Sequence, residues 1–146
     1  MKKILTSLGI LMVLFSAAQC DTETAGGILK GKWNCEFETD LGVASLELQI
    51  SEVNADSVKA TYTYTTRYTG TVTGKIKGKI NISGLSQNNS CLFNLSGSWR
   101  EVTANGFSGN GNLKFEFASD NSFDGYWTEI GSLKKWSWKG RKAASE

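Results

Sequence analysis

The chain has 146 residues, with 16 basic and 14 acidic side chains, no histidine, no proline and three cysteines. Without Lys2 and Lys3, which lie in the expected leader, the basic residues also number 14, so the mature chain is close to neutral. This balance gives no support for a nucleic-acid partner. Without histidine, the residue that most often acts as a general base in enzymes is missing.

Residues 1–19 have the layout of a secretory signal peptide. Two lysines precede an apolar run from Ile4 to Phe15, and small residues lead to Cys20. The run is too short to span a bilayer as a mature helix. The letters AAQC that end at Cys20 resemble the lipobox of bacterial lipoproteins, whose cysteine becomes the lipidated first residue. Gln19 and an alanine in place of the usual leucine depart from that motif, and a cut after Ala18 is the alternative.

The cysteine count bears on the same question. Three cysteines in an exported chain leave one unpaired in an oxidising compartment, unless that one has another role. A Cys35–Cys91 disulfide with Cys20 as the lipid carrier uses all three, and we expect that assignment. It places the protein in a bacterial cell envelope, held at the membrane by its lipid anchor alone. A soluble secreted or periplasmic protein is the alternative. Residues 20–28 are polar and glycine-containing, as in a flexible tether.

From residue 29 onward, apolar and polar residues alternate with period two, which is the pattern of strands with one buried face. Such strands are expected over residues 29–37, 44–50, 58–82, 91–99, 113–117, 123–127 and 136–140, with the long 58–82 stretch divided. Its outward face carries threonine and lysine, which suit a solvated strand face. Turn residues separate the segments, and no helix is expected after the leader. Eight or nine strands with short loops predict an all-β, antiparallel up-and-down barrel over residues 29–142, followed by a tail at 143–146. A β-sandwich is the alternative.

Gly31 and Trp33 form a Gly-x-Trp motif on the first expected strand, and Arg141 lies on the last. This combination resembles the calycin superfamily, which includes lipocalins, avidins and fatty-acid-binding proteins. The resemblance implies a barrel whose closed end is formed by Trp33 with the Arg141 guanidinium packed across its ring. Such a cation–π contact is structural and contributes about 0.5–2 kcal/mol. Motifs on internal lipocalin loops and avidin's biotin contacts are absent.

Many aromatic residues have inward parity, and an eight-stranded barrel is either filled by its own side chains or holds one small ligand. Aromatic rings supply apolar walls and tyrosine hydroxyls supply polar contacts. Glu101 is the polar candidate at the open rim. The candidate ligand-binding residues are Tyr62, Tyr64, Tyr68, Trp99, Glu101, Phe115, Trp127 and Trp136.

The sequence therefore favours an exported, lipocalin-like barrel, monomeric, that binds a small apolar ligand. The alternative is a filled barrel that binds a protein, such as an exported hydrolase inhibitor or an envelope interaction domain. Empty space inside the barrel favours the ligand, whereas a filled interior with an exposed aromatic patch favours the protein partner. No Ser-Lys pair, phosphate loop or metal-ligand pattern is present, so we expect no enzyme activity, no cofactor and no metal.

Overall fold

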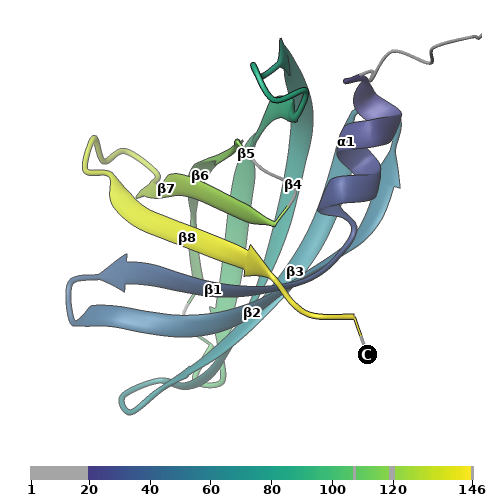
Figure 1. The fold of residues 1–146 in the computed structure, drawn as a ribbon. Helices are drawn as coiled ribbons and strands as arrows, with labels where there is room; N and C mark the ends of the chain where they lie inside the picture. The colour runs from purple at the N-terminus through teal and green to yellow at the C-terminus, as the bar shows by residue number, and fades with distance from the viewer. Residues whose placement is uncertain (1–19, 107, 119–120, 146) are drawn as a thin grey trace, which may run out of the picture.

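The computed structural model describes residues 20–106, 108–118 and 121–145, and the predicted signal peptide lies outside them. Eight antiparallel strands form a closed barrel in which each strand pairs with the next and β8 pairs with β1 (Figure 1). This confirms the predicted up-and-down barrel rather than the sandwich. The elements are α1 (Thr22–Leu29), β1 (Gly31–Thr39), β2 (Gly42–Asn54), β3 (Ser57–Thr66), β4 (Gly70–Leu85), β5 (Cys91–Thr103), β6 (Ser108–Phe117), β7 (Ser122–Glu129) and β8 (Trp136–Lys142).

The inward parity expected from the sequence matches the buried face of the strands. Strand β1 alternates strictly, with Trp33, Cys35 and Phe37 buried between exposed neighbours. The long 58–82 stretch divides into β3 and β4, in which Tyr62 lies opposite Gly74. A Cβ atom on Gly74 would overlap the Tyr62 ring, so this inward glycine makes room for the ring beside it.

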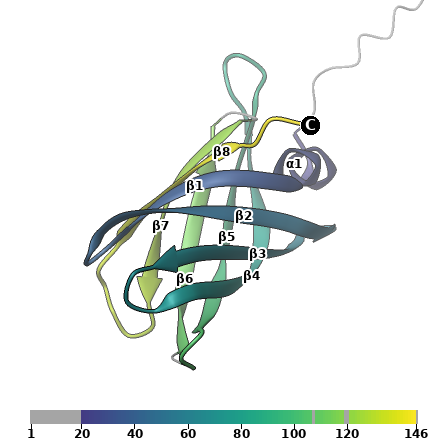
Figure 2. The ribbon, with the colours of Figure 1, turned by 90° about the horizontal axis from the view of Figure 1, so that it is seen from below.

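The helix α1 was not expected from the sequence. The polar segment predicted to be a tether folds into eight residues of helix, whose N-cap Asp21 accepts a hydrogen bond from the Thr24 amide at 2.8 Å. Ala25 and Leu29 are fully buried, and a Cβ on Gly26 would stand 2.9 Å from a methyl carbon of Val53. The glycine that suggested flexibility thus permits close packing. Helix α1 lies at one end of the barrel, away from the β1–β2 and β7–β8 hairpins (Figures 1 and 2).

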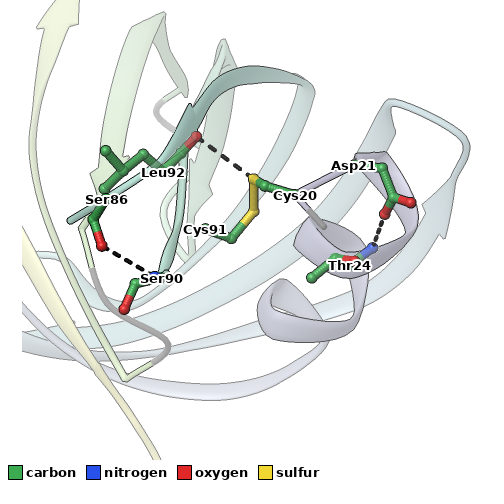
Figure 3. Close-up of a disulfide and its surroundings, with 7 residues drawn as sticks. All are labelled: Cys20, Asp21, Thr24, Ser86, Ser90, Cys91 and Leu92. Carbon is green, nitrogen blue, oxygen red and sulfur yellow. Dashed lines mark hydrogen bonds between the residues drawn. A yellow bond between two sulfur atoms is a disulfide. The ribbon is translucent and has the colours of Figure 1, made fainter. Parts of the chain in front are cut away.

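The predicted Cys35–Cys91 disulfide is wrong. Cys91 pairs with Cys20 (Figure 3), across a Cα–Cα distance of 4.9 Å. Cys35 is a buried free cysteine. Cys35 lies midway along β1, opposite Leu46, whereas Cys91 begins β5 at the end of the barrel where α1 packs. Parity showed that both side chains point inward, but it carries no information about their height along the barrel.

Trp33 lies at the closed end of the barrel, beside α1, but Arg141, which the calycin resemblance placed across its ring, does not cover it. Trp33 is fully buried and its Nε1 donates to the Leu29 carbonyl at 2.7 Å. Arg141 is exposed on the outward parity of β8, and the cation over the Trp33 ring is Lys142, 5.0 Å from the ring centroid. The period of two explains this correction, because adjacent residues of a strand point to opposite faces.

Lys142 also joins the last strand to the end of α1. Its Nζ donates to the carbonyls of Ile28 and Lys30, at 2.6 Å for Lys30, which helps to satisfy the free carbonyls at a helix C-terminus. Partial burial lowers the pKa of the Lys142 ammonium. Gly31, which follows, has φ +125°, a conformation that other residues rarely adopt, and so allows the chain to turn from α1 into β1. Within the described residues no helix has the length and hydropathy to cross a membrane.

Candidate functional site

A continuous column of aromatic rings fills the barrel from its closed end to the middle. Trp33 contacts Phe117 and Phe123, with ring centroids 5.5 and 5.6 Å apart. Phe123 stacks on Phe115 at 4.2 Å, and Phe115 meets the edge of Trp138 at 5.0 Å. These rings pack on one another in the part of the interior next to the closed end.

Above this column, at the open end, a cavity of about 170 Å³ remains. The floor includes Phe37 and Trp138, whose ring centroids are 5.8 Å apart. Two exposed acids at the mouth, Asp40 and Glu129, belong to the turn after β1 and the end of β7. The full lining is Phe37, Thr39, Asp40, Tyr62, Tyr64, Trp99, Glu101, Trp127, Glu129 and Trp138.

Glu101 is the polar centre of this cavity. Its two carboxylate oxygens accept hydrogen bonds from the hydroxyls of Tyr62, at 2.8 Å, and Tyr64, at 3.1 Å. Burial, followed by the negative charge of Glu101, raises the pKa of both tyrosines above its usual value, so both remain protonated donors. The glutamate, on β5, is thereby held in one orientation by two residues of β3, the next strand but one, and the Tyr62 ring reaches it across Gly74 of β4.

The aromatic walls are fixed by hydrogen bonds of their own. The Nε1 of Trp99 donates to the Thr128 carbonyl at 3.0 Å, and the Nε1 of Trp127 donates to the Glu38 carbonyl at 3.1 Å. The two rings meet edge to face, with centroids 5.4 Å apart. Trp127 also stacks on Trp136 at 5.8 Å. A pocket wall with this many contacts keeps its shape without a ligand, which lowers the cost of binding.

Five of the eight candidate ligand-binding residues line the cavity: Tyr62, Tyr64, Trp99, Glu101 and Trp127. Three do not. Phe115 is fully buried in the filled column, Tyr68 is 77% exposed on the β3–β4 turn, and Trp136 stacks on Trp127 as its cross-strand partner.

Sequence reasoning missed Phe37, Thr39, Asp40, Glu129 and Trp138 as lining residues. The signal that could have found Phe37 and Trp138 was their inward parity combined with their position near the ends of β1 and β8. Thr39, Asp40 and Glu129 lie at or beside hairpin turns, where alternation ends and sequence alone does not show which side chains face the mouth.

Other hollows lie on the outer surface of the sheet. One of them is lined mostly by exposed polar side chains of β1, β2, β7 and β8, including Glu36 and Arg141. Within the described part of the chain, no group of three acidic, cysteine or histidine side chains is close enough to hold a metal ion.

No protein-family model matches the sequence, and no curated protein matches it significantly. A solved structure of a redesigned beta barrel matches the fold, with a TM-score of 0.57 and 11% sequence identity. The match covers 86% of this chain and 97% of the designed one. The two chains share a fold. At this identity the likeness extends to the barrel architecture and supports no statement about ligands or partners.

Proposed function

We propose that this protein is an exported, lipocalin-like barrel that binds one small, largely apolar ligand in the cavity at its open end. The observation that carries the proposal is the cavity of about 170 Å³, with rigid aromatic walls and one oriented carboxylate. Ligand sites are commonly apolar hollows with few, well-placed polar groups. An apolar cavity of about 150 Å³ accommodates benzene, so the volume here suits a ligand of about one ring.

Two neighbouring tryptophans offer a matched test of this proposal. Trp127 lines the cavity, whereas Trp136, its stacked cross-strand partner, is similarly half-buried and is not among the lining residues. We expect one-ring compounds to change the tryptophan fluorescence of the mature domain and to bind saturably by calorimetry. Trp127→Ala should weaken that binding about tenfold, and Trp136→Ala should change it by less than about threefold. Failure of every one-ring compound to bind, or equal losses in the two variants, would refute the proposal.

Export rests on the leader and on Cys20, where two chemistries compete. The sulfur of Cys20 forms one bond besides the bond to its Cβ, so a molecule carries either a lipid thioether or the disulfide to Cys91. Both fates belong to exported proteins, because structural disulfides persist in oxidising compartments. Lipidation of Cys20 in the cell envelope therefore stays a prediction, and a soluble exported form with the disulfide is its alternative.

Intact-mass analysis of the protein made in a bacterium with its own leader distinguishes the two forms. A lipidated form has the added mass of acyl chains on Cys20 and a free Cys91 thiol. The disulfide form has no lipid and no thiol at Cys91, and partitions into the aqueous phase. A full-length chain that keeps residues 1–19 and remains in the cytoplasm would refute export altogether.

A protein-binding role is the second candidate, and a different observation favours it. Most of the large apolar side chains that are exposed in the described residues lie at the hairpins of the open end, and Leu133 is 98% exposed. Exposed apolar groups around one end of a small barrel suit contact with a protein. They are Leu41, Val43, Tyr68, Val102, Ile130 and Leu133.

The two candidate functions make different predictions for these surface residues. Leu133→Ser should leave one-ring binding unchanged and should abolish binding of a protein partner that docks at the open end. Ile82→Ser, at the opposite end of β4 and 37% exposed, is the control. If a partner is known and Leu133→Ser binds it as the parent does, the docking role is refuted.

A further inference from the structure

We infer that the ligand of the open-end cavity is a small organic cation: an ammonium group carried on an apolar body of about one ring. The inference rests on the proposed binding function and specifies its ligand class. It follows from three features of the same cavity, namely the charge of its lining, the free capacity of Glu101 and the ring faces around it.

The charged residues of the lining all have one sign. Asp40, Glu101 and Glu129 are acidic, and none of the described residues that line the cavity is basic. Glu101 lies in the interior and the other two lie at the mouth, so a ligand would pass exposed acids on its way to a partly buried one. A carboxylate-bearing ligand would meet negative charge along this path, whereas a cation is attracted along it.

Glu101 has capacity to bind a donor. An ionised carboxylate offers about four lone-pair sites, and the tyrosine hydroxyls use two of them, one on each oxygen. Each hydroxyl has a single proton, which it already donates. The tyrosine hydroxyls therefore have no free proton for a ligand, whereas Glu101 keeps acceptor capacity, and a ligand that brings its own N–H groups fits this carboxylate.

The ring faces around Glu101 add a second attraction for a cation. Trp99 and Trp127 meet edge to face at 88°, Phe37 and Tyr64 have ring centroids 4.8 Å apart, and all four rings line the cavity. Aromatic faces carry negative quadrupole charge, and groups of them bind ammonium ions in cages.

Outside the cavity, the protein places its own cations on neighbouring rings. Lys134 Nζ lies 3.7 Å from the centroid of Trp136, which stacks on Trp127 and is not among the lining residues. Lys135 Nζ lies 4.4 Å from the centroid of Tyr126. The rings that face the cavity have no such cation from the described chain, which leaves them for an ammonium group of the ligand.

Three probes with the same ring separate the ligand classes: benzylamine, an ammonium at neutral pH, neutral benzyl alcohol and anionic benzoate. We expect calorimetry on the mature domain to show benzylamine binding at least about tenfold tighter than benzyl alcohol, and benzoate not binding. Glu101→Gln, which removes the charge and keeps the shape, should weaken benzylamine binding about tenfold and leave benzyl alcohol within about threefold. Glu36→Gln, an exposed acid on the outer face of β1, is the control.

The outcomes distinguish this inference from the proposed function. If none of the probes binds, the ligand site itself is refuted and the inference with it. If benzyl alcohol or benzoate binds as tightly as benzylamine, or if Glu101→Gln weakens all bound probes equally, the site stands and the cation is refuted. Should Glu101→Gln fail to fold, Glu129→Gln at the exposed mouth replaces it. That variant should weaken benzylamine alone, by about threefold, and an unchanged affinity would overturn the inference.

Discussion

Replacement of Trp33 by alanine tests whether the closed end of the barrel is structural. The Trp33 indole is fully buried and packs on the rings of Phe117 and Phe123. Its Nε1 donates a hydrogen bond to the Leu29 carbonyl of α1. Truncation of a buried tryptophan costs about 3–5 kcal/mol. Loss of the hydrogen bond to the Leu29 carbonyl falls within that range because such bonds contribute about 1 kcal/mol.

A loss of about 4 kcal/mol corresponds to a fall of roughly 2 M in the urea midpoint, for a slope of about 2 kcal/mol per M. Far-UV circular dichroism measures it without relying on the tryptophan that is removed. Trp33→Phe keeps part of the ring contacts and loses the donor to Leu29, so we expect a smaller loss of about 1–2 kcal/mol.

Two results would contradict this reasoning. A Trp33→Ala protein that unfolds within about 1 kcal/mol of the parent would show that the closed end contributes little to stability. A stable Trp33→Ala protein that no longer binds any one-ring probe would show that the ligand binds at the closed end of the barrel and not at the open end. Trp136→Ala is the control, because its half-buried ring lies at the opposite end.

Three further predictions concern the cysteines and the outer face. Cys91→Ser removes the disulfide to Cys20, which closes a loop of 71 residues, and should lower the free energy of unfolding by about 4 kcal/mol. A reductant should cause the same loss in the parent protein and no further loss in the variant. Burial raises the pKa of the Cys35 thiol from 9.0 to about 12, so the thiol loses its proton at a lower pH in the unfolded chain than in the folded one. The free energy of unfolding should therefore fall as the pH rises from 9.0 to about 12. Cys35→Ala should reduce that fall, as measured by urea titrations at several pH values. Lys59 and Lys77 are cross-strand partners on β3 and β4, and their like charges repel. Lys77→Thr should therefore raise the free energy of unfolding by about 0.5 kcal/mol at low salt and by less at high salt. An equal gain at both salt concentrations would contradict the charge explanation.

The alternation of the sequence predicted which side chains point inward, because a strand has a period of two and each face has one environment. It could not predict height along the barrel. Parity therefore permits a Cys35–Cys91 disulfide, which the assignment of Cys20 to a lipid then leads us to expect, and the structure shows Cys35 free. Parity also permits Phe115 in a ligand site, although the structure places this ring deep in the filled column. The family resemblance implied that Arg141 covers the Trp33 ring, although Arg141 has outward parity on β8. The next residue, Lys142, has inward parity, and its Nζ lies over that ring.

Helix α1 could not be predicted from its own sequence, because the segment is short and contains two adjacent glycines, which are poor helix formers. Its stability comes from packing, since short helices are marginal without tertiary contacts. Ala25 and Leu29 are buried against the barrel, and the disulfide at Cys20 holds the start of the helix to β5. These contacts depend on a barrel end that exists only after the strands have closed.

The residues that stabilise the barrel and the residues that line the ligand cavity lie mostly at opposite ends of the core, and Trp138 contacts both groups. At one end α1, the Cys20–Cys91 disulfide and Trp33 close the barrel, and substitutions there should change unfolding without changing ligand affinity. At the other end, Glu101 and Tyr64 are partly buried beside the cavity, whereas Tyr62 is 3% exposed and packs on Trp138. Trp138 belongs to both regions, because it packs on Phe115 below and lines the cavity above. A change in its packing is therefore the route by which the filled column can alter the shape of the ligand site.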